Sequence, residues 1–216
     1  MKFEMHVHSD YSDGLMSVRE IAERVKELGL DGFALTDHNT IEGHSEARKI
    51  AKKLDLKFIP GLEISAKEGH IIGLGISKKI KRGLTAEKTV ERIKKAGGTS
   101  VAAHPYDPFR HGVGDLVKGL EFDYIESFNS RAYFPWYNWK ASKEAKKLEI
   151  PEIAGSDAHK LAGIGMAVTE TDSLKNLYCG KSKTYKTKWV GTPAITLGAL
   201  KRKMIKYSNP DNLPFL

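Results

Sequence analysis

Residues 3–38 read FEMHVHSDYSDGLMSVREIAERVKELGLDGFALTDH, and this stretch predicts the type of fold. In its first run, residues 3–8, the alternation is that of a strand, and a period of two residues places His6 and His8 on the same face. Two imidazole rings side by side on one face can bind a single metal ion. A helical pattern and a second apolar run follow, so the chain opens with a strand, a helix and a strand.

The helix within this stretch has clear start and stop signals. Ser17 and Glu20 have the spacing of a capping box, an apolar stripe follows, and Gly29 ends it. These signals predict a helix over residues 18–28, and residues 32–36 form the next strand. The other expected elements are a helix over 43–54, strands over 57–64 and 70–76, a helix over 86–96, strands over 100–103 and 124–128, a helix over 138–148 and a strand over 152–155.

This order of elements predicts a parallel sheet. Roughly seven strand and helix units in 216 residues indicate a closed or nearly closed α/β barrel more than an open doubly wound sheet. The sequence contains no glycine-rich phosphate loop. Near the C-terminus, residues 175–188 are polar and rich in lysine, and we expect them to form an exposed loop.

The amino-acid composition limits the cellular compartment and the kinds of binding partner that we expect for this protein. No stretch approaches the roughly 18 consecutive apolar residues of a membrane helix, so no membrane partner is expected. The first strand begins too early to leave room for a signal peptide, and the single cysteine, Cys179, cannot form an internal disulfide. We therefore expect a cytoplasmic protein and give Cys179 no catalytic role. The net charge of +8 could attract nucleic acid, although lysines solvated on helices are the favoured explanation.

Candidate metal ligands follow the ends of the apolar runs. They include six of the eight histidines, namely His6, His8, His38, His70, His104 and His159, together with Glu63 and Asp157. Because the carboxyl ends of parallel strands share one rim of a barrel, these side chains are expected to converge there. Imidazole mixed with carboxylate suits Zn²⁺, Mn²⁺ or Fe²⁺, and the lack of thiolate ligands argues against a purely structural zinc site.

Five short motifs in a fixed order resemble those of the PHP domain family of metal-dependent phosphoesterases. They are His6-Val7-His8-Ser9 with Asp13-Gly14, Thr36-Asp37-His38, Glu63 after Gly61, His104-Pro105, and Gly155-Ser156-Asp157-Ala158-His159. The resemblance covers residues 1 to about 170. It implies a distorted (β/α)7 TIM-like barrel, which agrees with the strand count above. We expect one domain over residues 1–216, with a motif core over 1–170 and a C-terminal extension over 171–216.

The resemblance also implies a ligand set for two or three divalent ions of Mn, Zn or Fe. One ion would be held by His6, His8, Glu63 and Asp157. Glu63 would bridge to a second ion bound by His70 and His104, and Asp13, His38 and His159 would form a third site. Because some family members have histidine where this chain has Asp13, two ions are better supported than three.

For such a site the expected chemistry is hydrolysis of a phosphate ester by a metal-activated hydroxide. Asp157 or His159 could protonate the leaving oxygen, which makes them the candidate catalytic residues. Asn129 and Arg131 follow the strand over 124–128 and are expected to bind the phosphate group, with Arg110 as a second choice. The expected substrate is a small phosphorylated molecule that resembles a nucleotide or histidinol phosphate.

Two other functions stay open: a small phosphodiesterase or nuclease, and a PHP-fold subunit that binds nucleic acid without catalysis. A cluster of aromatic residues permits base stacking, although packing against the barrel or a pocket wall is the favoured interpretation. This cluster consists of Tyr133, Phe134, Trp136, Tyr137 and Trp139. His44 and His111 lack motif partners and are expected to be solvated surface residues. The sequence does not determine the oligomeric state.

Overall fold

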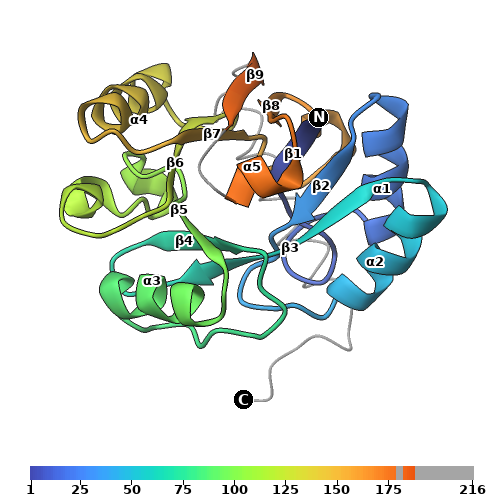
Figure 1. Ribbon diagram of the computed structural model, residues 1–216, viewed down its shortest axis with the longest axis horizontal. Helices are drawn as coiled ribbons and strands as arrows, with labels where there is room; N and C mark the ends of the chain where they lie inside the picture. Colours follow the sequence, from blue (N-terminus) through green and yellow to red (C-terminus); the bar gives the residue numbers. More distant parts are fainter. Residues whose placement is uncertain (179–181, 188–216) are drawn as a thin grey trace, which may run out of the picture.

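In the described part of the chain, nine strands form one curved sheet that closes almost completely into a barrel. The longer helices surround its outer side, and a short helix lies across its middle (Figure 1). The computed structural model describes residues 1–178 and 182–187. The strands are β1 (Lys2–Val7), β2 (Gly32–Leu35), β3 (Lys57–Ser65), β4 (His70–Leu74), β5 (Thr99–Ala102), β6 (Tyr124–Asn129), β7 (Glu152–Gly155), β8 (Ala167–Glu170) and β9 (Lys183–Thr187). The helices are α1 (Val18–Glu27), α2 (His44–Lys53), α3 (Ala86–Lys95), α4 (Pro135–Lys147) and α5 (Leu174–Tyr178), with 3₁₀ turns η1 (Pro108–Arg110), η2 (Gly114–Lys118) and η3 (Leu161–Gly163).

The predicted α/β barrel is confirmed. It closes through a single bridge and not through a continuous ladder of backbone hydrogen bonds. The sheet order is β7-β6-β5-β4-β3-β2-β1-β8-β9. The barrel closes where Val7 at the end of β1 and Ala158 after β7 form a single parallel bridge. Next to it, the His8 amide donates to the Ala158 carbonyl at 2.9 Å. Beside this bridge, the hydroxyl of Thr169 donates to the carbonyl of Ala154 and accepts from its amide, each at 2.9 Å. Side-chain hydrogen bonds therefore replace part of the backbone pairing.

The expectation of an entirely parallel sheet is wrong at β4. This strand runs antiparallel to both β3 and β5. The connection from β3 is a tight turn in which the Ala66 amide donates to the Gly69 carbonyl at 3.0 Å. Such a turn can join only antiparallel strands, because a parallel crossover needs a dozen or more residues. Between β5 and β6 the chain forms η1 and η2 instead of an α-helix, so the barrel is distorted.

The predicted loop over residues 175–188 is also wrong at residues 175–178 and 183–187, where the chain forms regular elements. Residues 174–178 form α5, and β9 pairs antiparallel with β8, which itself runs antiparallel to β1. Residues 179–181 and 188–216 lie outside the described part of the chain, so Cys179 and most of the expected extension over 171–216 do too. The single-domain organisation stays a prediction.

The helices follow their sequence signals closely. The capping box of α1 is present, because the Ser17 side chain accepts from the Glu20 amide and the Glu20 carboxylate accepts from the Ser17 amide. Helix α4 begins at Pro135, three residues before the predicted start, since proline is well tolerated at the first helical position. No helix in residues 1–178 and 182–187 is both long enough and apolar enough to cross a membrane.

Candidate metal centre

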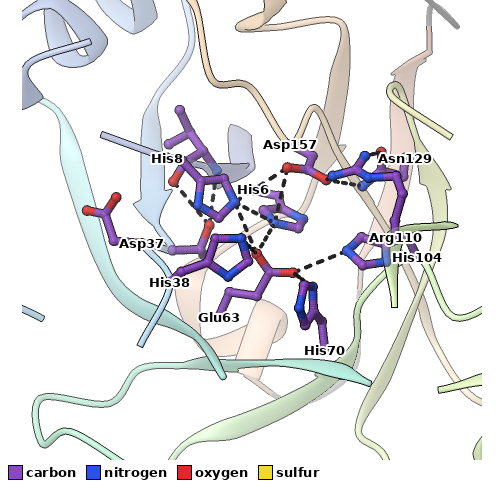
Figure 2. Close-up of polar contacts among 12 residues, drawn as sticks. His6, His8, Asp37, His38, Glu63, His70, His104, Arg110, Asn129 and Asp157 are labelled. Carbon is purple, nitrogen blue, oxygen red and sulfur yellow. Dashed lines mark hydrogen bonds and ion pairs between the residues drawn. The ribbon is translucent and has the colours of Figure 1, made fainter. Parts of the chain in front are cut away.

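Side chains of the nine predicted metal ligands gather at one end of the barrel, where they form a continuous set of contacts. Figure 2 shows the part of this set that surrounds Glu63. They come from β1 and the loop after it, the segment after β2, β3, the start of β4, and the segments that follow β5 and β7. The residues are His6, His8, Asp13, His38, Glu63, His70, His104, Asp157 and His159. The predicted convergence is therefore observed, and the assignment of each residue to an ion stays a prediction.

Glu63 lies in the middle of this cluster. Its Oε1 is 3.1 Å from Nδ1 of His70 and 3.1 Å from Nε2 of His104. Its Oε2 faces the Nε2 atoms of three other rings, those of His8 at 3.1 Å, His6 at 3.3 Å and His38 at 3.4 Å. Burial opposes ionisation of Glu63, but the surrounding histidines, His38 first, hold the pKa of its carboxyl well below the usual range. One carboxylate thus serves two groups of histidines, as a bridging ligand does.

Two further groups bring candidate ligand atoms within 4.8 Å of one another. One comprises His6, His8 and Asp157, whose Oδ1 lies 3.4 Å from Nε2 of His8. The other comprises His8, Asp13, His38 and His159, and here Oδ2 of Asp13 lies 3.0 Å from Nε2 of His159. His8 belongs to both groups, which differs from the expected division into separate sites.

The contacts of these rings fit a metal ion. Nδ1 of His6 lies 2.9 Å from Oε1 of Glu126, an arrangement in which the ring donates its proton and turns the Nε2 lone pair inward. That Nε2 atom is only 3.1 Å from Nε2 of His8. Within the described residues, the buried Nδ1 atoms of His8 and His104 have no hydrogen-bond partner. Nitrogen and carboxylate donors this close require a cation or a proton between them, and the donor types suit divalent ions.

Two arginines flank this cluster on the side of Asp157. The guanidinium groups of Arg110 and Arg131 each contact Asp157, and their side chains are only 13% and 11% exposed. Burial opposes the charge on Asp157, but Arg110 and His6 hold the pKa of its carboxyl well below the usual range. Asn129 is fully buried, and its amide group contacts Arg110, Asp157 and Glu126. In this arrangement Asn129 would have to exchange partners to bind a substrate.

Comparison with known proteins identifies the family. Residues 4–139, more than half of the chain, match the PHP domain, and residues 135–176 match the PHP-associated region. The chain belongs to the PHP domain family. This confirms the predicted resemblance.

Three relatives illustrate the range of this PHP family. The uncharacterized protein MJ1587 of Methanocaldococcus jannaschii is 38% identical over 60% of this chain and 82% of its own length. A 5'-3' exoribonuclease of Haemophilus influenzae is 36% identical over 44% of this chain and 41% of its own. A putative metal-dependent phosphoesterase of Bifidobacterium adolescentis has the same fold, with a TM-score of 0.71, 18% identity and coverage of 83% of this chain and 96% of its own.

Other PHP relatives are named as a phosphatase and a phosphodiesterase. The chain spans less than half the length of these relatives and of the exoribonuclease. Together the comparisons place the chain in the PHP family, in which these named relatives act on phosphate esters, and they leave the substrate of this chain undetermined.

Two buried carboxylates hold the predicted metal ligands in place and had no assigned role in the sequence analysis. Glu126 accepts from His6 through Oε1 and from the His104 amide through Oε2, at 2.9 and 2.8 Å. Asp37 accepts from the amide and hydroxyl of Ser9 at 2.7 and 2.6 Å, which fixes the loop that carries Asp13. The available signal was a carboxylate within or directly after a short apolar strand, since burial there demands a partner.

Two surface expectations prove wrong. His44 is buried, with Nε2 at 2.8 Å from the Gly61 carbonyl, because the first turn of α2 faces the sheet. Burial lowers the pKa of its ring.

In the aromatic cluster, packing against the barrel is confirmed for the half-buried Tyr137. It is wrong for Phe134, Trp136 and Trp139, which are more than half exposed. His111 is exposed, as expected.

Metal affinity is expected to rise with pH up to about 9. Burial opposes protonation of His8, but its contacts with Asp157 and Glu63 prevail and raise the pKa of the ring to about 9 in the metal-free protein. Because a bound ion must displace that proton, and the pKa of His6 is raised as well, apparent affinity should increase at least about tenfold per pH unit below this pKa. Titration calorimetry with Mn²⁺ at pH 7, 8 and 9, in two buffers of different ionisation enthalpy, would measure the affinity and the protons released. Affinity independent of pH would contradict this picture.

Proposed function

We propose that this PHP domain hydrolyses phosphate esters of nucleotides, using two or three divalent ions of Mn, Zn or Fe. The observation that supports this proposal is the position of Arg110 and Arg131 directly beside the Glu63 cluster. Bound ions would lower the pKa of a water molecule and neutralise phosphoryl oxygens. A guanidinium group presents five N–H donors in a planar fork, so each arginine can contact Asp157 and a phosphoryl oxygen together.

The protonation states of the two candidate catalytic residues shape this proposal. Burial lowers the pKa of His159 to about 3, and nearby positive charge on His8 and Arg131 adds to the effect. Asp157 is ionised as well. At neutral pH neither side chain therefore holds a proton to donate to a leaving group in the metal-free protein, which favours ligand roles for both. Their part in proton transfer stays a prediction.

A nucleotide substrate is favoured over histidinol phosphate by the names of the relatives. One matched protein is a 5'-3' exoribonuclease and another is a 3',5'-nucleoside bisphosphate phosphatase. The presence of nine side chains able to coordinate metal at one end of the barrel argues against the non-catalytic alternative, since unpaired buried charges carry a large energetic penalty.

Activity measurements with defined metals test this proposal. The protein would be stripped with chelator, reloaded with Mn²⁺, Zn²⁺ or Fe²⁺, and assayed with p-nitrophenyl phosphate, its bis-ester, nucleoside 3',5'-bisphosphates, histidinol phosphate and short RNA. We expect hydrolysis of the nucleotide esters that chelator abolishes and metal restores. Preference for histidinol phosphate would overturn the substrate class, and a metal-free, inactive protein that binds RNA would support the non-catalytic alternative.

Replacing Arg131 by alanine should mainly raise KM. A charged hydrogen bond to phosphate contributes about 1.5–3 kcal/mol, so KM for a phosphate monoester should rise roughly 10- to 100-fold while kcat changes less. Steady-state kinetics of the Arg131→Ala variant would measure both constants. The exposed Arg19 on α1 offers a matched control, since Arg19→Ala removes the same charge far from the cluster. Equal KM values for the two variants would exclude Arg131 from phosphate binding.

A further inference from the structure

Exposed aromatic side chains are concentrated on two neighbouring segments, η1 and the start of α4, each of which contains or follows an arginine that contacts Asp157. Phe109, Phe134, Trp136 and Trp139 are 61%, 53%, 52% and 55% exposed. Burying such rings in the barrel would be favourable, so their exposure is not explained by the stability of this chain. With Tyr133, which contacts Phe109, we call these five residues the aromatic rim.

Contacts within the aromatic rim arrange the rings in pairs. The ring centroids of Phe109 and Tyr133 are 4.8 Å apart, and those of Trp136 and Trp139 are 5.4 Å apart with an interplanar angle of 27°. The amide of Tyr133 donates to Asp107 at 2.8 Å, which joins η1 to the start of α4. The rings are therefore held in place as flat surfaces that face solvent, as base-stacking platforms are.

The aromatic rim begins next to the predicted phosphate-binding residues. Phe109 precedes Arg110 in η1, and Tyr133 follows Arg131 by two positions. Both arginines contact Asp157 in the metal centre. A ligand with a phosphate group at the cluster thus has aromatic rings in the two chain segments that carry these arginines.

Positive charge accompanies the rings. Helix α4, at the edge of the molecule in Figure 1, carries Lys140, Lys143, Lys146 and Lys147 but only one acidic residue, Glu144. Nζ of Lys143 lies 5.0 Å from the ring centroid of Trp139. Protein-binding surfaces are depleted in lysine, whereas single-stranded nucleic acid is bound by aromatic rings interleaved with cations. The charge and the rings together fit a polyanion with planar groups.

We propose that the aromatic rim and the lysines of α4 bind unpaired bases and phosphates of a single-stranded nucleic acid whose end reaches the metal centre. The protein would then prefer oligonucleotides to mononucleotides. Binding at the rim is independent of catalysis, and only delivery of the chain end to the metal centre rests on the proposed function.

Anisotropy of a 12-nucleotide RNA labelled at its 3' end, measured in the presence of EDTA, tests the binding. The double variant Trp136→Ala/Trp139→Ala should raise Kd by at least about fivefold, because stacking of a base contributes on the order of 1 kcal/mol or more. Trp136→Phe/Trp139→Phe retains flat rings and should stay within about twofold of the unmodified protein. An abasic chain of the same length and charge should bind more weakly than the RNA. Leu116→Ala, at another exposed apolar side chain, serves as the control.

The outcomes separate this inference from the proposed function. We expect the alanine double variant to raise KM for the RNA while hydrolysis of p-nitrophenyl phosphate is unchanged. The inference would be overturned if the protein bound RNA and the abasic chain with equal affinity. It would also be overturned if the protein hydrolysed p-nitrophenyl phosphate but did not bind RNA. Self-association lost in the same double variant, without RNA binding, would assign the rim to a protein contact instead. RNA binding without any turnover would contradict only the proposed function.

Discussion

Replacing Glu63 by glutamine is expected to reduce turnover by at least about 100-fold and to lower the bound metal below the level of the unmodified protein. Both carboxylate oxygens of Glu63 face histidine nitrogens, at distances of 3.1–3.4 Å. Glutamine keeps the shape but provides one acceptor oxygen and no negative charge, and its NH₂ group turns donors toward one set of rings. Elemental analysis of the purified variant, followed by hydrolysis assays at saturating Mn²⁺, would measure both effects.

The Glu23→Gln variant makes the same chemical change at a half-exposed carboxylate on α1 that faces Arg19 at 3.8 Å. We expect its metal content and turnover to equal those of the unmodified protein, because surface ion pairs contribute little. Full metal content and turnover within a few-fold in Glu63→Gln would show that the bridging role is wrong.

The Gly155→Ala variant is expected to lower the free energy of unfolding by about 1–3 kcal/mol, as overpacked cores do. A Cβ atom at Gly155 would lie 2.2 Å from Oε1 of Glu126 and 2.5 Å from Cβ of His6. Neither neighbour can retreat easily, since both are fully buried and Glu126 accepts hydrogen bonds from His6 and the His104 amide. Movement of Glu126 would release the His6 ring, so metal affinity should fall along with stability.

Urea unfolding of the metal-free protein and a separate metal titration would distinguish these two effects. Gly119→Ala is the matched control, because a Cβ atom there meets nothing within 4 Å and the Gly119 φ of −117° suits any residue. Unchanged stability and metal affinity in Gly155→Ala would mean that the end of β7 adapts to the side chain.

Regular elements were predictable because their signals are local. The capping box at Ser17 and Glu20, the apolar period of α1 and the alternation in β1 each depend on residues within one or two turns of the chain. The same reasoning placed the candidate ligands, since parallel strands bring their carboxyl ends to one rim. Most errors concerned how elements connect and pair. The direction of β4 was predicted wrongly, and the pairing of β9 with β8 was missed.

By itself, the sequence determined the barrel, the family and the set of nine candidate ligands, because periodicity and short motifs are properties of neighbouring residues. Only the tertiary structure decided which groups share an environment. It placed Glu126 behind His6, and it buried His44 against the sheet. It also left Trp136 and Trp139 exposed on α4. Burial and partnership at these positions depend on residues up to 120 positions apart, as in the pair of His6 and Glu126. A pattern read along the chain does not contain that information.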